Sequence, residues 1–276
     1  MQLNNEILHD FINCQYKAYR KSKWQKGTIS EYEIIYNQLK HTQKINFEKK
    51  LLGNNKQIRS NLAFDIPITK SSFFLNFTFI NDNLSLTLDG IEFVSKKNFL
   101  PLFVTPFEKV TKVDKLFIAL QAALIQNEFN IHADCCNVIY GQNLKQIKFK
   151  LSSFAQTTKK IIVDLYKTLS NSVPPSFQKN IHCSVCEFQN NCFEKLVERD
   201  DLSLMPSLKA KDILQKNNKG IFSVRQLSYT FRPKKNLHQK RKFLPELKAL
   251  AIRENKTFVN EIPNIKDSTT KVFLDI

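Results

Sequence analysis

The chain has 276 residues, which is long enough to bury a sizeable core and to divide into two folded units. Hydrophobic residues make up 42% and charged residues 24% of the sequence, a balance typical of globular proteins rather than disordered ones. The net charge of +17 favours a polyanionic partner, DNA or RNA, although a solvated basic surface arising from AT-rich coding would give the same excess of lysine.

No segment reaches the roughly 18 consecutive apolar residues that span a bilayer, and the N-terminus lacks the apolar run of a signal peptide. We therefore expect a cytoplasmic protein without membrane association. Thiols stay reduced in the cytoplasm, so the six cysteines are expected to be metal ligands or core residues rather than disulfides.

The first part of the chain changes from helical to strand periodicity. Apolar residues recur with helical spacing over 5–22, and a second helix is predicted over about 30–51. From residue 61 the period becomes two, which predicts strands at 61–68, 73–80, 84–94 and 99–104. Asn81-Asp82-Asn83 is the expected hairpin turn between the second and third of these strands. The fourth strand is almost continuously apolar, as is usual at the centre of a sheet.

The elements that follow complete the fold class. They are a helix at 112–126, strands at 135–141 and 145–151, and a helix at 155–171. Helical and strand segments in this order predict an α/β fold, with a mixed sheet flanked by helices over residues 1–197.

Three segments are predicted after this domain. Residues 198–230 read as two short helices around a turn, similar to a helix–hairpin–helix module, and residues 231–268 as a basic linker. Residues 269–276 resemble the opening strand of a further domain. We therefore expect the chain to be truncated or to be one piece of a longer protein.

Three cysteines form a compact motif, Cys183-x2-Cys186-x5-Cys192, in which a turn can point the sulfurs toward one metal ion or cluster. A closed site needs a fourth ligand, and the candidates are Cys14, Cys135, Cys136 and His182. Cys135 and Cys136 are neighbours on a predicted strand, so they point to opposite faces and suit packing better. The spacing does not separate zinc from iron–sulfur, and buried cysteines without a metal are the remaining alternative.

The pattern F-x-x-C-x-x-x-x-Y around Cys14, together with a distal C-x2-C-x5-C, resembles the iron–sulfur clasp of RecB-type nucleases and of related CRISPR-associated exonucleases. The chain is more closely similar to RecB-like nucleases that carry a C-terminal RNase H-like exonuclease domain, whose motifs match residues 200–235, 244–256 and 272–276. The resemblance implies the restriction-endonuclease-like fold of the PD-(D/E)XK superfamily. It also implies a [4Fe–4S] cluster held by Cys14, Cys183, Cys186 and Cys192.

The resemblance further implies a nuclease site in which an Asp on one strand and a D/E-x-K on the next hold Mg²⁺ or Mn²⁺ and activate water. Asp89 matches the first acid or is a structural acid at a strand end, but the next strand has Leu102-Phe103-Val104 where D/E-x-K is expected. Glu108 and Lys109 would make a non-standard replacement, and Gln121 matches the helix glutamine of the superfamily. We therefore predict a degenerate site that is weakly active or inactive.

Basic residues gather between 229 and 256, where nine Lys or Arg accompany two Glu and aromatic residues are interleaved. Such a segment can contact phosphates and stack on bases, or it can be a solvated linker. The predicted nucleic-acid-binding residues are Arg232, Lys234, Lys235, Lys240, Arg241 and Lys242. The expected hairpin of the helical module, Pro206-Ser207-Leu208, lacks the glycine that usually cradles a phosphate.

The leading hypothesis is a nucleic-acid-binding, iron–sulfur-clasped RecB-like domain with a degenerate nuclease site. It would deliver DNA or RNA to an RNase H-like exonuclease domain located downstream or on a separate chain. In that domain Asp275 would be the first metal-binding acid. The second hypothesis is an active Mg²⁺-dependent DNA exonuclease. The third is a zinc-stabilised scaffolding module with no role in nucleic-acid binding.

Overall fold

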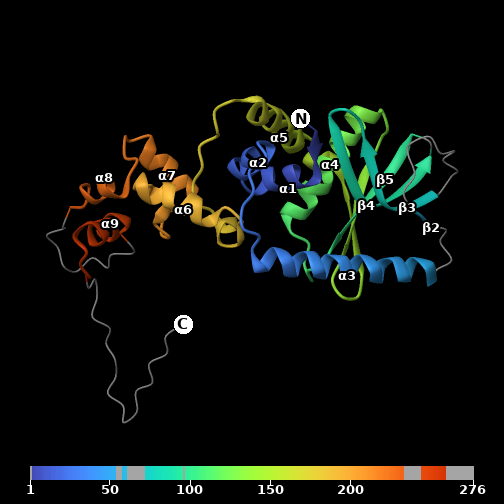
Figure 1. Cartoon of the computed structure of the whole chain (residues 1–276), viewed down its shortest axis with the longest axis horizontal. Coiled ribbons are helices and arrows are strands. Elements are labelled where there is room, and N and C mark those ends of the chain that lie inside the picture. Colours follow the sequence, from blue (N-terminus) through green and yellow to red (C-terminus); the bar gives the residue numbers. More distant parts are fainter. Residues whose placement is uncertain (1, 54–57, 61–71, 96, 233–243, 259–276) are drawn as a thin grey trace, which may run out of the picture. The chain divides into compact units, whose positions relative to one another are not determined.

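The structure is a computed structural model, and it describes residues 2–53, 58–60, 72–95, 97–232 and 244–258 (Figure 1). The chain divides into two compact units, the first formed by residues 1–177 with 181–189 and the second by residues 178–180 with 190–276. No helix within the described ranges is both long enough and apolar enough to cross a membrane.

One mixed β-sheet forms the centre of the first unit. Its described strands are β1 (Leu3–Asn4), β2 (Ile58–Ser60), β3 (Ser72–Ile80), β4 (Leu84–Ser95), β5 (Asn98–Thr105), β6 (Cys135–Tyr140) and β7 (Lys145–Lys150). The sheet order is β2-β3-β4-β5-β6-β7, and β1 pairs in parallel with the start of β4. Strands β3, β4 and β5 form an antiparallel meander, β6 is parallel to β5, and β7 is antiparallel to β6. The predicted α/β class with a mixed sheet is confirmed.

The turn between β3 and β4 follows from its side chains. The Oδ1 atom of Asn81 accepts hydrogen bonds from the N–H groups of Asn83 (2.9 Å) and Leu84 (2.7 Å), and the Asn81 N–H donates to the Leu84 carbonyl (2.8 Å). Strand β5 lies between β4 and β6, which explains its nearly continuous apolar sequence. The turn and the central strand both agree with the sequence-based prediction.

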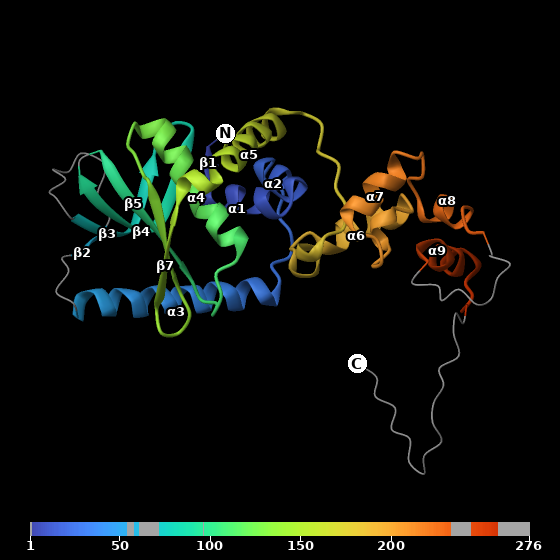
Figure 2. The same ribbon diagram turned by 180° about the vertical axis from the view of Figure 1, so that it is seen from behind.

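Helices cover both faces of this sheet (Figures 1 and 2). They are α1 (Asn5–Asn13), α2 (Gln15–Ser22), α3 (Glu31–Gly53), α4 (Lys112–Phe129) and α5 (Ala155–Ser170). Residues of α1, α4 and α5 form the larger core with Leu86 and Leu88 of β4. On the other face α3 contributes Phe47, which packs in a smaller core with Val104 of β5. Because side chains alternate along a strand, Asp89 of β4 points toward α3.

The N-terminal region differs from the prediction in two respects. Residues 5–22 form two helices instead of one, because Cys14 adopts an extended backbone (φ −161°, ψ 109°) between them. Hydrophobic spacing on each side of Cys14 still fits a helix, so periodicity cannot reveal one extended residue. Strand β1 has only two residues and gives no period-two signal. The predicted strand at 61–68 lies outside the described residues.

The described part of the second unit is helical. Its helices are α6 (Gln189–Glu198), α7 (Ala210–Asn217), α8 (Val224–Ser228) and α9 (Pro245–Glu254). Helices α7, α8 and α9 form a small core together with the segment before α7; its residues are Leu202, Met205, Ile213, Val224, Leu227 and Ala249.

Two features of the second unit correct the prediction. The turn that joins α7 to α8 contains Gly220, with a φ of 75°, whereas the expected hairpin at Pro206–Leu208 precedes α7. Helix α9 lies within the stretch expected to be a linker. It folds because Ala249 is buried in the small core and because Lys216 of α7 forms an ion pair with Glu246 (2.6 Å).

Candidate functional site

Cys14 is the junction of α1 and α2, not a residue within a helix as predicted. Its N–H donates to the Asp10 carbonyl (2.7 Å), and its carbonyl accepts from the Ala18 N–H (3.2 Å). The ends of both helices are therefore fixed on this residue, and its thiol is half-buried.

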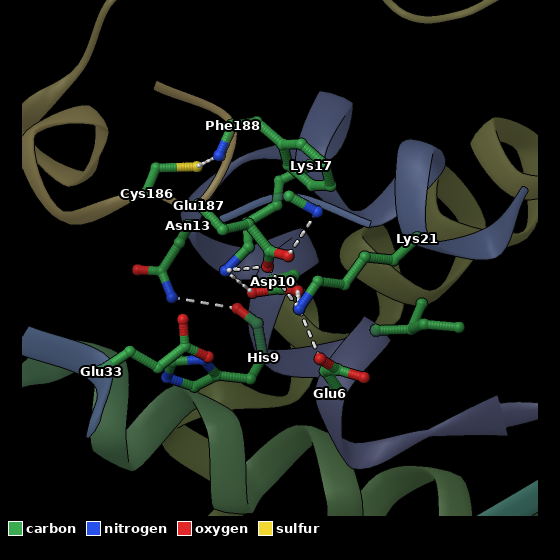
Figure 3. A network of polar contacts seen from close by, with 12 residues as sticks. Glu6, His9, Asp10, Asn13, Lys17, Lys21, Glu33, Cys186, Glu187 and Phe188 are labelled. Carbon is green, nitrogen blue, oxygen red and sulfur yellow. Dashed lines mark hydrogen bonds and ion pairs between the residues drawn. The ribbon is translucent and has the colours of Figure 1, made fainter. Parts of the chain in front are cut away.

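Cys183 and Cys186 lie in a tight turn. Cys183 belongs to the 3₁₀ turn Ile181–Val185, and the Cys186 N–H donates to the Cys183 carbonyl (3.3 Å). The N–H of Phe188 donates to the Sγ atom of Cys186 (3.5 Å; Figure 3). These hydrogen bonds give residues 183–188 the compact turn that the Cys183-x2-Cys186 spacing predicts.

The first unit brings Cys14 and Cys183 close enough to interact electrostatically. Burial raises the pKa of the Cys14 thiol, and Cys183 adds to this rise. Cys136 is instead fully buried in the larger core, where burial, with a contribution from Cys135, raises its pKa. Cys14, Cys183 and Cys186 all belong to the first unit. Cys192 lies on α6 and belongs to the second unit.

Glu187, which follows Cys186, connects the cysteine turn to the N-terminal helices through buried ion pairs (Figure 3). Its Oε1 atom lies 3.4 Å from the Nζ atom of Lys17 and 2.5 Å from that of Lys21. Asp10 of α1 pairs with the same two lysines, at 2.7 Å and 3.3 Å. The side chains of Glu187, Asp10 and Lys17 are at most 6% exposed, so these charges are held together away from water.

Backbone contacts hold the same turn against the segment between α2 and α3. The Gly27 N–H donates to the Glu187 carboxylate (3.2 Å), and the Thr28 N–H donates to the Glu187 carbonyl (3.0 Å). The Ser30 hydroxyl donates to the Val185 carbonyl (2.8 Å). A Cβ atom on Gly27 would lie 2.5 Å from the Glu187 carbonyl oxygen, so this approach requires glycine. The chain between α2 and α3 is thereby joined to a turn about 160 residues later.

Glu6, Asp10 and Glu187 offer carboxylate oxygens within 4.8 Å of one another, an arrangement that can suit a cation. In this structure Lys21 forms ion pairs with all three acids, and Lys17 pairs with Asp10 and Glu187. Burial would lower the pKa of Lys21, but the hydrogen bonds to Glu187 and Glu6 raise it above its usual value. The two ammonium groups therefore balance two of the three carboxylate charges, and the cluster acts as an electrostatic link beside the cysteines.

Asp89 is a buried carboxylate enclosed by positive charge and a backbone donor. Its Oδ1 atom lies 2.6 Å from the Nζ atom of Lys44, and its Oδ2 atom lies 3.3 Å from that of Lys40. The Val104 N–H also donates to Oδ2 (2.9 Å). Burial alone would raise the pKa of Asp89, but Lys40 and Lys44 outweigh it and hold the pKa below its usual range.

The strand opposite Asp89 is distorted. Asn76 of β3 has a φ of 49°. The regular β3–β4 pairing holds on both sides of this residue, where Leu75 pairs with Gly90 and Phe77 pairs with Leu88. The side-chain oxygen of Asn76 accepts a hydrogen bond from Lys44 (3.3 Å). A pocket of about 200 Å³ lies here, lined by His41, Lys44, Ile45, Phe47, Glu48, Leu75, Asn76, Asp89 and Val104.

The other predicted catalytic residues have separate structural roles. Glu108 accepts a hydrogen bond from the Gln142 N–H (2.9 Å) and so supports the turn between β6 and β7. Lys109 is exposed. Gln121 of α4 is buried and donates to the Asn5 side chain (3.0 Å) and to a β4 carbonyl (3.2 Å), which joins α4 to α1 and the sheet. The structure does not assemble them around Asp89, which pairs with Lys40 and Lys44 of α3 and accepts a hydrogen bond from Val104 of β5.

The sequence predicts Asp89 as a candidate site residue, but it does not predict that Lys40 and Lys44 form ion pairs with it. Lys40 and Lys44 are four residues apart, so they share one face of the helix predicted at 30–51, and this spacing is the signal that could have paired them with a buried acid. Among the predicted nucleic-acid-binding residues, Arg232 donates to the carbonyl groups of Tyr229 (2.8 Å) and Phe231 (3.0 Å). Lys234, Lys235, Lys240, Arg241 and Lys242 lie outside the described residues, as does Asp275.

No family model matches the chain, and no curated protein matches it. Among solved structures the chain is similar to one described as the crystal structure of SSO0001. The two share 14% sequence identity, the match covers 69% of this chain and 85% of that chain, and the TM-score is 0.36.

Proposed function

We propose that this chain is a nucleic-acid-binding domain built on a restriction-endonuclease-like core, with its hydrolytic site replaced by a lysine-clamped aspartate. Two features of the sheet support the proposal for the core. Strands β3, β4 and β5 form a meander, and α4 then leads to β6, which is parallel to β5. Asp89 lies on the middle strand of the meander, where the resemblance to RecB-like nucleases expects the first metal-binding acid.

The observation that carries the proposal is that both carboxylate oxygens of Asp89 already have partners within the chain. Oδ1 is paired with Lys44, and Oδ2 with Lys40 and the Val104 N–H. A catalytic Mg²⁺ needs oxygen ligands from several groups, and its charge would be opposed by two ammonium groups at this point. The next strand supplies only Leu102, Phe103 and Val104, all buried in apolar cores. This arrangement favours a structural acid over a catalytic one.

The proposal includes a structural [4Fe–4S] cluster. Cys14, Cys183 and Cys186 would hold it from the first unit, and Cys192 is included on its spacing in the sequence. The lysine–carboxylate network beside the turn supports this part, because it holds Glu187 next to Cys186 against the helices that flank Cys14. When bound, the cluster would supply a cross-link between distant segments. A visible absorbance band with equal iron and sulfide after anaerobic purification would distinguish the cluster from zinc.

A binding and cleavage experiment tests the function. The protein is mixed with labelled single-stranded DNA or RNA and retained on a filter over a series of salt concentrations, and parallel samples receive Mg²⁺ or Mn²⁺. We expect retention that falls steeply with salt and substrate that stays intact. Cleavage that is lost in Asp89→Ala would establish the exonuclease hypothesis instead. Absence of retention at low salt would contradict nucleic-acid binding.

A further inference from the structure

Trp24 is the only tryptophan of the sequence, and it is 89% exposed in the connection between α2 and α3. Its φ is 60°, and its N–H donates to the Lys21 carbonyl (2.9 Å) at the end of α2. The next residue, Gln25, donates its N–H to the Arg20 carbonyl (3.1 Å). Trp24 therefore occupies the left-handed position that ends a helix.

Both aspects of this placement are unfavourable for a tryptophan. The left-handed position usually carries glycine or asparagine, because a larger residue brings its Cβ close to the following carbonyl. An exposed indole also leaves a large apolar surface in water, whereas tryptophan is highly buried on average. The described residues of the first unit leave the indole 89% exposed, so they do not bury it. Strain combined with exposure is typical of a residue that contacts another molecule.

Basic and amide residues are neighbours of Trp24 in the sequence or line the same pocket. Lys23 and Lys26 flank it in the sequence, and both are exposed. Trp24 also lines a pocket of about 680 Å³, together with the amide side chains of Gln2, Asn4 and Gln25. This volume is within the range of small-molecule sites. One amide atom of each side chain is already hydrogen-bonded within the chain: Gln2 Nε2 donates to the Asn81 carbonyl (2.8 Å), Asn4 Oδ1 accepts from the Ile7 N–H (2.9 Å), and Gln25 Oε1 accepts from Arg20 (2.7 Å). The second amide atom of each can meet the edge of a base.

The carboxylates of this pocket determine which part of a nucleotide fits. Glu6, Glu33 and Glu187 also line it, and Lys21 pairs with the first and third of these acids. Such a lining opposes a phosphate inside the pocket but accepts an uncharged base ring. The phosphates are better accommodated outside, at Lys23 and Lys26.

We propose that Trp24 stacks on an unpaired base of a single-stranded nucleic acid, while Lys23 and Lys26 contact the flanking phosphates. The inference rests on the proposed function and adds the location and the strandedness of the ligand. A base within a duplex has both faces covered by its neighbours, so stacking on the indole selects single strands.

The fluorescence of Trp24 tests this directly, because no other tryptophan contributes. The complete, metal-loaded chain is titrated with an unlabelled oligothymidylate, and a matched duplex is the comparison. We expect saturable quenching by the single strand that weakens with salt. By filter binding, Trp24→Ala should lower the affinity by about 5- to 150-fold, corresponding to the loss of one stacked base. Trp24→Phe, which keeps an aromatic ring, should recover part of the affinity.

Two further variants separate stacking from folding. Trp24→Gly relieves the left-handed strain, so it should keep or raise the melting temperature while still losing affinity. Lys23→Ala/Lys26→Ala should reduce the salt dependence of binding, whereas the exposed pair Lys145→Ala/Lys148→Ala on β7 should not. Filter retention without quenching, or unchanged affinity in Trp24→Ala, would overturn the inference and leave nucleic-acid binding intact. Absence of retention would overturn the proposed function as well.

Discussion

Replacing Asp89 by alanine distinguishes a structural acid from a catalytic one. The substitution leaves the buried N–H of Val104 on β5 without its acceptor, which costs about 1–3 kcal/mol. It also removes the partner of Lys40 and Lys44, whose side chains are 21% and 29% exposed and can turn toward water, so each lost pair adds at most about 1 kcal/mol. We therefore expect the free energy of unfolding to fall by about 1–5 kcal/mol.

Urea unfolding followed by circular dichroism measures this change. Asp89→Asn is the matched control, because its amide oxygen can still accept the hydrogen bond from Val104, and it should lose less stability than Asp89→Ala. Active-site acids are commonly retained at the expense of stability, so their removal is often neutral or stabilising. An Asp89→Ala protein as stable as the unmodified chain would therefore refute the structural role.

The pH dependence of the same pair of proteins follows from the lowered pKa of Asp89. An acid with a lowered pKa contributes its full stabilisation above the pKa of the unfolded state, about 3.9, and loses it as the pH falls through the folded-state pKa. The stability difference between the unmodified chain and Asp89→Asn should be constant from pH 7 to about 5 and shrink below about pH 4. A difference that changes between pH 5 and 7 would contradict the assignment.

Three more predictions concern the clasp and the sheet. Glu187→Gln should lower the free energy of unfolding by about 2–4 kcal/mol, because it breaks buried ion pairs. Glu6→Gln is the control, and it should cost at most about 1 kcal/mol because the Glu6 side chain is 60% exposed. Equal losses of stability would contradict the role of Glu187 as a buried ion-pair partner. Cys14→Ser should lose metal on elemental analysis and lower the melting temperature, and a variant that keeps both would remove Cys14 from the site. Gly141→Ala should lower the free energy of unfolding by about 1–2 kcal/mol, because φ is 70° at this residue and a Cβ would lie 2.7 Å from a Glu108 carboxylate oxygen. Unchanged urea unfolding would show that the turn between β6 and β7 relaxes freely.

The sheet could be predicted largely from local patterns. Period-two hydrophobicity and the asparagine turn determine β3 and β4, and the continuous apolar run identifies β5 as a central strand. The break at Cys14 could not be predicted, because a single extended residue leaves the helical spacing on both sides unchanged. Strand β1 depends on pairing with β4 about 80 residues later, and its own two residues carry no strand signal.

The candidate site required long-range information that spacing does not contain. The motif predicts that Cys183 and Cys186 converge, but only the fold shows that Cys14 interacts electrostatically with Cys183 while Cys136 is buried in the core. The sequence also indicates an incomplete nuclease site at Asp89. It does not show that lysines from α3 neutralise this acid, because the face of a helix that meets a sheet depends on packing.

Metal binding at Asp89 is the most direct test of the central claim. The unmodified chain and Asp89→Ala are titrated with Mn²⁺, and the free ion is measured by electron paramagnetic resonance. The lysine-clamped site predicts the same weak, non-saturable uptake in both proteins, because two ammonium groups already neutralise the carboxylate. Saturable Mn²⁺ binding that disappears in Asp89→Ala would show a working metal site and contradict the claim.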